Sequence, residues 1–454
     1  MSRYRRRVFD TVLVANRGEI ARRVIRTCQG LGIKAIGVHS EADAGARHVA
    51  DADESVLLGP APPTESYLDG AKVLEAARQT GAQAIHPGYG FLAESASFAQ
   101  AVLDAGLVWI GPSPDAIERM GDKVNARNAM AAAGVPVAAG TPAPLTDVEE
   151  AVVLARELGY PLMVKAAAGG GGIGMGVATD EATLRAAFET ATTRAARFFG
   201  SPSILLERYI ATARHVEVQV LGLNDGRTVT LGERDCSVQR RHQKVAEESP
   251  SPGLEPELRA RMLDAAVRAG EAVGYRNAGT VECLVDVAAN DFVFLEMNTR
   301  LQVEHPVTEL VTGVDIVEQQ LRIAAGLEPS YDTAVQPSGH ALELRVYAED
   351  PVRFLPGPGA ITRWVEPSGD GVRVDAGYAE GDVVTPYYDP LLAKLAVWGP
   401  SRDEALERAR RAVADFVVEG PKCNLPFFAE LLANPQFVSG DYDTGLVERM
   451  RAKR

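Results

Sequence analysis

A single stretch of the chain, residues 292–306 with the sequence FVFLEMNTRLQVEHP, constrains the fold and the function more than any other. Side chains of an extended segment alternate between two faces, so one face of this stretch would carry five polar groups, Glu296, Asn298, Arg300, Gln302 and Glu304. Alternation of this kind most often marks a strand with one solvated face. Here, however, the groups are suited to a metal, an anion and a general base, with no filler between them. We therefore predict a functional site.

A second strand over 280–286 precedes this stretch, and the turn-forming residues 288–291 would join the two as a hairpin. Cross-strand neighbours share a face, so a loop with an odd number of residues would place Glu282 opposite Glu296. Two facing carboxylates repel each other strongly unless a cation lies between them. A hard divalent ion with oxygen ligands is the natural cation, and the hairpin thus predicts Mg²⁺ bound together with nucleotide phosphates.

The N-terminal part, from 11 to 110, alternates short apolar strands with amphipathic helices, which predicts a doubly wound parallel sheet. Ligands are expected at the carboxyl ends of such strands, where the motifs ANRGE at 15–19 and HPGYG at 86–90 stand. Neither motif is a GxGxxG fingerprint, so a dinucleotide is not expected. Tight-turn geometry and a role in the site explain the two motifs equally well.

The middle of the chain carries the phosphate-binding candidates. One helix is expected from Asp115 to Ala133, with Lys123 inside it, and an apolar strand ends on Lys165. Four consecutive glycines follow, namely Gly169, Gly170, Gly171 and Gly172. Their backbone N–H groups can wrap a phosphate chain beside the lysine charge, although the pattern is not a Walker A loop. A flexible surface hairpin would look similar, but the predicted magnesium carboxylates favour phosphate binding, and we expect 136–203 to form a small mobile lid.

The second half of the chain begins with a strand at 203–210, followed by a strand that places His215, Glu217 and Gln219 on one face. Residues 233–244 are expected to form a loop that attracts a small anion, because they are dense in hydrogen-bond donors within an acidic protein. Further strands are expected at 341–347, 360–365 and 391–397, with a helix from Ser401. An arginine in a strand, such as Arg345, is usually an ion-pair or surface group.

Composition excludes several classes of function. The formal net charge of −14 argues against a nucleic-acid partner, which needs a clustered basic surface. No apolar run reaches membrane-spanning length, and no apolar core follows the arginine-rich start, so we expect a cytoplasmic protein without membrane contact. The four cysteines show neither CxxC spacing nor histidine partners, and we expect them to be reduced thiols.

Several motifs in one order resemble the biotin carboxylase family, the ATP-grasp component of acetyl-CoA and propionyl-CoA carboxylases. They are MGDK at 120–123, the glycine loop, ERDCSVQRRHQK at 233–244 and EMNTRLQVEHP at 296–306, and the likeness runs from 15 to 389. The resemblance implies an α/β fold with three parts. These are an N-terminal doubly wound parallel sheet domain over 1–114, a linker helix and ATP-grasp lid over 115–207, and the rest of the ATP-grasp unit with a C-terminal α+β domain over 208–454.

The resemblance also implies roles for individual residues. Nucleotide binding would fall to the side chains of Lys123, Lys165 and His215, with Glu207 and the backbone at Arg208 and Ile210 at the adenine and ribose. Mg²⁺, or Mn²⁺, would be held by Glu282, Glu296 and Asn298. Bicarbonate would bind Arg300, Gln302 and the Val303 amide, with Gln239, His242 and Lys244 completing the anion pocket. Glu304 would be the general base, and Arg345 would stabilise the enolate of biotin.

The implied reaction joins bicarbonate to the γ-phosphate of ATP as carboxyphosphate and then passes CO₂ to carrier-linked biotin, in the service of fatty-acid synthesis. The implied partners are a biotin carboxyl carrier protein, carboxyltransferase subunits and a second copy of the chain. Two alternatives remain, a related ATP-grasp carboxylase acting in a urea, guanidine or 2-oxo acid system and a non-catalytic ATP-binding regulator. The chain departs from the family at Ile173, where arginine or lysine is usual, and at Ala168, where glycine is common.

Overall fold

The N-terminal part of the computed structural model, which describes residues 8–167 and 175–452, is a five-stranded parallel sheet. Its strand order is β3-β2-β1-β4-β5, with bounds Thr11–Val14 (β1), Lys34–Ser40 (β2), Glu54–Gly59 (β3), Ala84–His86 (β4) and Val108–Trp109 (β5). Helices α1 (Gly18–Gly30), α2 (Arg47–Asp51), α3 (Gly70–Thr80) and α4 (Ala96–Asp104) connect the strands. Alternate residues of β1 pack on opposite sides, Val12 toward α1 and Leu13 toward α3 and α4. The predicted doubly wound sheet is confirmed, and β3 is an additional strand at its edge.

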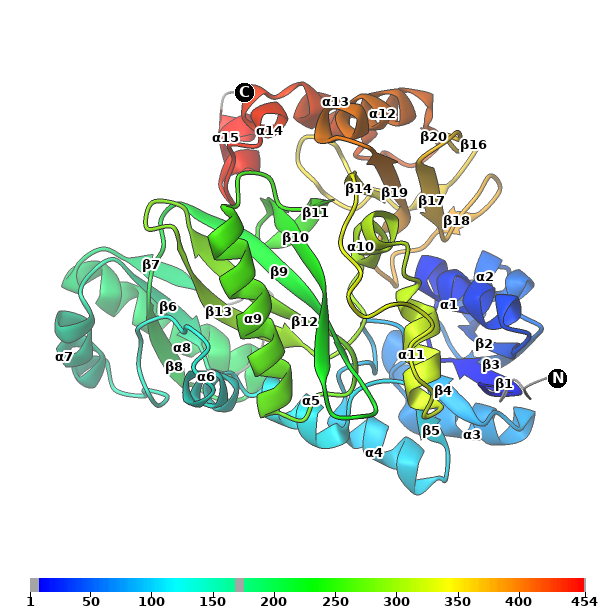
Figure 1. The fold of residues 1–454 in the computed structure, drawn as a ribbon, viewed down its shortest axis with the longest axis horizontal. Helices are drawn as coiled ribbons and strands as arrows, with labels where there is room; N and C mark the ends of the chain where they lie inside the picture. Colours follow the sequence, from blue (N-terminus) through cyan, green and yellow to red (C-terminus); the bar gives the residue numbers. More distant parts are fainter. Residues whose placement is uncertain (1–7, 168–174, 453–454) are drawn as a thin grey trace.

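A small antiparallel sheet, ordered β7-β6-β8, forms a separate unit at one end of the molecule (Figure 1). Its strands are β6 (Leu162–Ala166), β7 (Gly176–Ala178) and β8 (Ile204–Arg208), covered by α7 (Val148–Leu158) and α8 (Glu181–Phe199). Apolar side chains from these strands and helices make a core of their own. The unit corresponds to the small group of strands and helices expected between 136 and 203.

The centre of the molecule is an eight-stranded sheet with the order β13-β12-β9-β10-β11-β14-β19-β17. The strands are β9 (Ala213–Gly222), β10 (Thr228–Arg240), β11 (Gln243–Ser249), β12 (Asn277–Asp286), β13 (Asp291–Asn298), β14 (His340–Tyr347), β17 (Val372–Ala376) and β19 (Leu391–Gly399). All its pairings are antiparallel. Helix α9 (Pro256–Ala272) lies across β9 and β10 (Figure 1). One continuous sheet thus carries both strands of the predicted hairpin and the strand with Arg345.

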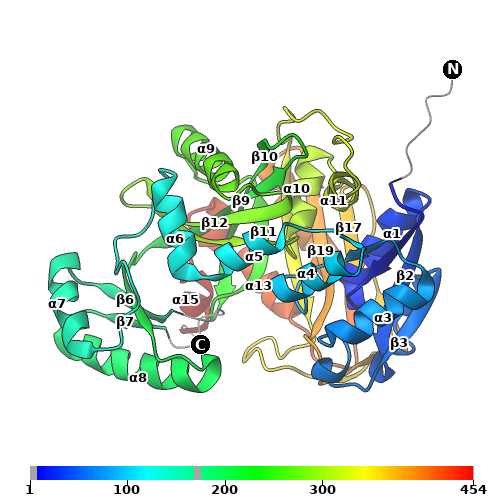
Figure 2. The ribbon, with the colours of Figure 1, turned by 90° about the horizontal axis from the view of Figure 1, so that it is seen from below.

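The remaining elements surround this sheet (Figure 2). The helices are α5 (Pro114–Gly121), α6 (Lys123–Ala132), α10 (His305–Thr312), α11 (Ile316–Ala324), α12 (Arg402–Asp415), α13 (Leu425–Ala433), α14 (Pro435–Ser439) and α15 (Leu446–Ala452). The short strands are β15 (Gly359–Ala360), β16 (Arg363–Val365), β18 (Val383–Val384) and β20 (Val417–Glu419). Among the described residues, no helix combines the length and apolar character needed to cross a membrane.

Two predicted elements are wrong in ways that matter for the site. The helix expected from Asp115 to Ala133 is two helices, because Asp122 is extended and its carboxylate accepts the N–H groups of Val124 and Asn125 as the cap of α6. This break puts Lys123 at the first position of a new helix. The donor-rich segment 233–244 is not a loop either, since it forms the end of β10, a tight turn and the start of β11.

Candidate active site

A cavity of about 1890 Å³ lies between the N-terminal sheet, the small sheet and the central sheet. Of the predicted site residues, those that line it are Lys123, Lys165, Glu207, Arg208, Ile210, His215, Gln239, His242, Lys244, Glu282, Glu296, Asn298, Arg300, Gln302, Val303 and Arg345. Glu304 is fully buried behind this wall. Gly169, Gly170, Gly171 and Gly172, together with Ala168 and Ile173, lie outside the described residues. The sequence motifs, far apart in the chain, therefore converge on one cavity.

The hairpin of β12 and β13 places Glu282 directly opposite Glu296, as predicted. The expected odd-numbered loop is wrong, because residues 287–290 form a loop of even length that pairs Asp286 with Asp291. A β-bulge restores the predicted register: Cys283 pairs with Phe294, so Leu295 is the extra residue before the glutamate pair. The two carboxylates face each other as a consequence of the bulge.

The polar stretch is not extended to its end, and this part of the prediction is wrong. Strand β13 stops at Asn298, and Glu304 already stands at the N-cap position of α10. Hydrogen bonds, rather than a strand, hold these side chains together. Arg300 donates to Asn298 Oδ1 at 2.9 Å and to Gln302 Oε1 at 3.0 Å. The alternating pattern correctly predicted that these polar side chains lie close together, but a compact loop rather than an extended strand brings them together.

Lys244 is the electrostatic centre of the site. Its Nζ lies 2.5 Å from Glu217, 2.7 Å from Glu282 and 2.6 Å from Glu304. Burial would raise the pKa of Glu282 and Glu304, but Lys244, together with His215 at Glu282 and Arg345 at Glu304, outweighs burial and holds the pKa of both carboxyls well below their usual range. Both carboxylates are therefore ionised throughout the neutral pH range.

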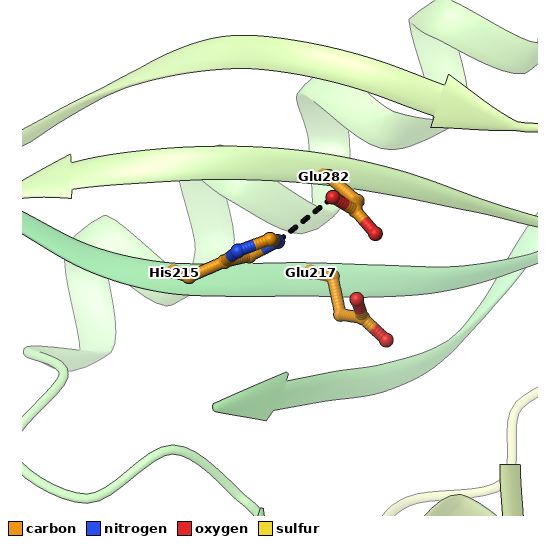
Figure 3. A group of neighbouring side chains, drawn as sticks. All are labelled: His215, Glu217 and Glu282. Carbon is orange, nitrogen blue, oxygen red and sulfur yellow. Dashed lines mark ion pairs between the residues drawn. The ribbon is translucent and has the colours of Figure 1, made fainter. Parts of the chain in front are cut away.

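Figure 3 shows the His215 ring reaching from β9 toward Glu282 on the neighbouring strand β12, with Glu217 two residues along the same strand as His215. The His215 Nε2 atom lies 2.9 Å from Glu282 Oε2, and Gln239 Nε2 lies 2.7 Å from the other ring nitrogen, Nδ1. Burial lowers the pKa of His215, but the carboxylates of Glu282 and Glu217 together outweigh burial and leave the pKa raised. His215, Glu217 and Glu282 can each offer one ligand atom within 4.8 Å of the others. Glu217 was placed on the right face by its alternation with His215, but no role was predicted for it.

The side chains of Glu296 and Lys123 line the cavity without a hydrogen bond or ion pair to any other described residue. Burial raises the pKa of Glu296, and repulsion by Glu282 adds to the effect. Burial also lowers the pKa of Lys123, helped by the nearby charge of Lys165, which itself lies 2.6 Å from Glu207. A bound cation would stabilise the ionised Glu296 carboxylate, and a bound anion would stabilise the charged Lys123 ammonium. The oxygen-rich Glu282 and Glu296 pair fits a hard divalent cation, and the two lysines fit phosphates.

Arg345 connects Glu304 to a further buried acid that the sequence did not reveal. Its Nη2 lies 2.9 Å from Glu304 Oε2 and 2.6 Å from Glu247 Oε1. Its Nε–H finds no acceptor among the described residues, although Arg345 lines the cavity. A second missed residue is Glu94, whose carboxylate accepts from Arg300 Nε at 2.8 Å. Neither acid lies in a motif whose pattern points to the site.

We predict that Glu247→Gln changes how stability depends on pH. Burial, opposed by Arg345, raises the pKa of Glu247 to about 7, so the native state binds this proton more tightly than the unfolded state does. The stability contribution is thus complete below the unfolded pKa of about 4.5 and is lost as pH rises through 7. Between pH 5 and 8, the variant should gain up to about 3 kcal/mol relative to the wild type. Thermal unfolding of both proteins across this range measures the gain, and parallel curves would contradict it.

Sequence families match nearly the whole chain. Residues 8–117 match the family "Biotin carboxylase, N-terminal domain", residues 122–330 match "Carbamoyl-phosphate synthase L chain, ATP binding domain", and residues 343–449 match "Biotin carboxylase C-terminal domain". Among curated proteins, biotin carboxylase of Halalkalibacterium halodurans is 52% identical, over 97% of each chain. A pyruvate carboxylase subunit from Methanothermobacter thermautotrophicus is 46% identical, over 98% of this chain and 90% of its own.

Solved structures match equally completely. The biotin carboxylase–βγ-ATP complex from Campylobacter jejuni superimposes with a TM-score of 0.95 at 43% identity, over 97% of this chain and 99% of its own. The biotin carboxylase domain dimer of Hydrogenobacter thermophilus 2-oxoglutarate carboxylase, in complex with MgADP, ADP and bicarbonate, gives a TM-score of 0.93 at 44% identity, over 97% of each chain.

Proposed function

The chain belongs to the biotin carboxylase family, and from this premise we propose which of its residues carry the reaction. It is an ATP-grasp ligase that uses ATP, Mg²⁺ and bicarbonate to carboxylate biotin. The single observation that carries the residue assignment is the position of Glu304, which is fully buried, ionised and held between Lys244 and Arg345. Arg300, Gln302 and Val303 line the cavity just before it in the chain.

In the first step of the proposed reaction, Glu304 acts as the general base. Bicarbonate binds the Arg300 guanidinium, the Gln302 amide and the Val303 N–H, and Glu304 takes its proton. An oxygen of bicarbonate then attacks the γ-phosphorus of ATP, which gives carboxyphosphate and releases ADP. Lys244 and Arg345 initially keep Glu304 a weak base. As they turn toward the substrate anions, the pKa of Glu304 rises and proton transfer becomes easier.

Nucleotide and metal are held by charged groups that line the cavity. Lys123 and Lys165 hold ATP phosphates with His215, whereas Glu207, Arg208 and Ile210 face the adenine and ribose. The pocket of Gln239, His242 and Lys244 holds the anions. Glu282, Glu296 and Asn298 provide the oxygen ligands for Mg²⁺, which neutralises phosphate charge as the reaction proceeds. The carboxylate of Glu296, which has no partner among the described residues, supports this assignment.

Biotin is carboxylated in the second step. Carboxyphosphate breaks into CO₂ and phosphate, the phosphate accepts the ureido N–H proton, and the ureido nitrogen then attacks CO₂. The Arg345 Nε–H is buried without an acceptor among the described residues, so it is free to stabilise negative charge on the ureido oxygen. Exclusion of water by the small sheet would protect carboxyphosphate from hydrolysis.

We also propose the partners, the pathway and the location of the enzyme. Proteins of this family work with biotin carriers and carboxyltransferases, and the similar proteins include an alpha chain of propionyl-CoA carboxylase as well as a pyruvate carboxylase subunit. We favour a role as a component of an acetyl-CoA or propionyl-CoA carboxylase in fatty-acid synthesis. A homodimer is supported by the dimer of the Hydrogenobacter relative. Dependence on ATP favours the cytoplasm as the location of the enzyme.

Bicarbonate-dependent ADP release, with and without free biotin, tests the proposed function. Release should require bicarbonate and Mg²⁺, and biotin should stimulate it. ADP release at the same rate with and without biotin would contradict the proposal and favour a different ATP-grasp ligase. Addition of carrier and carboxyltransferase subunits with acetyl-CoA, propionyl-CoA or a 2-oxo acid would then identify the final acceptor.

A further inference from the structure

The two N-terminal motifs with no assigned role meet at the carboxyl ends of β1 and β4. The Asn16 side chain donates from Nδ2 to the carbonyl oxygens of Pro87 and Tyr89, at 2.7 Å each. The Tyr89 hydroxyl in turn donates to Glu19 Oε1. These bonds fix the motifs against each other, as tight turns require. They also aim the Glu19 carboxylate at the central sheet.

The partner of Glu19 in the central sheet is Lys394 on β19. Its side chain is completely buried, and Nζ lies 3.0 Å from Glu19 Oε2. The same Nζ donates to the backbone carbonyl of Val303, also at 3.0 Å. A fully buried lysine is rare unless it is paired, because removing the ammonium from water is costly. One ion therefore joins the N-terminal sheet to the loop that carries the bicarbonate residues.

The strand register makes this contact more specific. Lys394 pairs with Arg345 on the neighbouring strand β14, so the two side chains share one face of the sheet. Arg345 holds the carboxylate of Glu304, whereas Lys394 holds the carbonyl of Val303, the preceding residue. Two adjacent cations of one sheet thus fix two consecutive residues of an irregular loop.

The Val303 carbonyl belongs to the peptide that leads into Glu304. The peptide unit is planar, so the direction of this carbonyl sets the orientation of the Glu304 N–H and the point from which the Glu304 side chain begins. We propose that Lys394 is a positioning residue for bicarbonate activation, with Glu19 as its counter-ion. This inference rests on the proposed function, because it assigns Lys394 to the orientation of the bicarbonate loop and of the general base.

The test compares Lys394→Met, Glu19→Gln and the double variant. In Lys394→Met the loop loses its restraint, and a misplacement of about 1 Å can cost roughly 10²-fold in rate. We expect kcat for bicarbonate-dependent ATP cleavage to fall by about that factor, with a raised KM for bicarbonate. The dissociation constant for MgADP should stay within about twofold, because Lys394 does not line the nucleotide cavity.

The double variant separates positioning from charge balance. It leaves no unpaired buried ion, so its thermal stability should recover toward that of the wild type even where Lys394→Met folds poorly. Its kcat should remain as low as that of Lys394→Met, because the Val303 carbonyl still lacks its donor. Recovery of wild-type kcat in the double variant would overturn the inference, and so would an equal loss of MgADP affinity.

A matched control uses the exposed pair of the same residue types, Lys34 and Glu54, whose side chains are about half exposed. Lys34→Met with Glu54→Gln should leave both kinetics and stability unchanged. If the wild type cleaved ATP without needing bicarbonate, the proposed function would be wrong. If the wild type required bicarbonate but Lys394→Met kept wild-type kinetics, only the positioning role of Lys394 would be wrong.

Discussion

Glu304→Gln is expected to lower kcat for bicarbonate-dependent ATP cleavage by about 10²–10⁴, the usual cost of losing a general base. Glutamine keeps the size of the side chain but cannot accept a proton as the carboxylate does. Lys244 retains Glu217 and Glu282, and Arg345 retains Glu247, so the fold should survive. Steady-state kinetics with saturating ATP, bicarbonate and free biotin would measure the loss.

Nucleotide binding should change little in this variant, because Glu304 is buried behind the cavity wall rather than in it. Titration with MgADP would verify this. Glu247→Gln is the matched control, since Glu247 is also a buried acid paired with Arg345 but lies farther from the bicarbonate residues in the chain. The control should keep most of its activity. A Glu304→Gln rate within tenfold of the wild type would remove Glu304 from the role of base.

The sequence predicted the facing glutamates of the hairpin correctly, but not how they come to face each other. Alternation and the turn residues located both strands. The bulge at Leu295 depends on how β13 pairs with β12, and no residue type in the stretch predicts it. The predicted parity of the loop was therefore wrong, while the predicted pair was right.

Charge density misled the prediction for 233–244. The clustered donors predict a loop that attracts a small anion, yet the segment is mostly strand and Arg234 is completely buried on β10. Its guanidinium bonds Glu217 and Gln219 on β9 and Thr308 on α10. Such compensation requires partners far apart in the chain, so periodicity in one segment cannot reveal it. The same limit explains why Glu247 and Lys394 were missed.

The resemblance to the family supplied what local patterns could not, namely the roles of Lys244 and Arg345. Both stand in segments whose ordinary explanation is structural. The structure brings both into contact with Glu304. It also brings Lys244 into contact with Glu217, a residue that neither the pattern nor the resemblance assigned. The charge balance around Lys244 is thus a property of the fold, and its removal should have a correspondingly large effect.

Lys244→Met should destabilise the protein by at least about 3 kcal/mol and abolish catalysis, because three buried carboxylates lose their shared cation. In the wild type, Lys244 holds the pKa of Glu282 and Glu304 low, and the stability gained from this is present above about pH 4.5 and lost in acid. Without the lysine, mutual repulsion and burial raise the carboxyl pKa values. Stability is then lost as pH rises, so the deficit of the variant should be larger at pH 8 than at pH 5.

Added Mg²⁺ should restore part of this stability, because a divalent cation can replace the missing charge among Glu217, Glu282 and Glu304 and stabilises only the folded state that binds it. The rise in thermal midpoint with Mg²⁺ should therefore be greater in Lys244→Met than in the wild type. Lys422→Met is the control, since the side chain of Lys422 is 70% exposed beside Asp350 and such a surface ion pair should contribute little to stability. If Lys244→Met proved as stable as this control, or indifferent to Mg²⁺, the three carboxylates would not depend on a shared cation, and the proposed binding of metal beside them would lose its electrostatic basis.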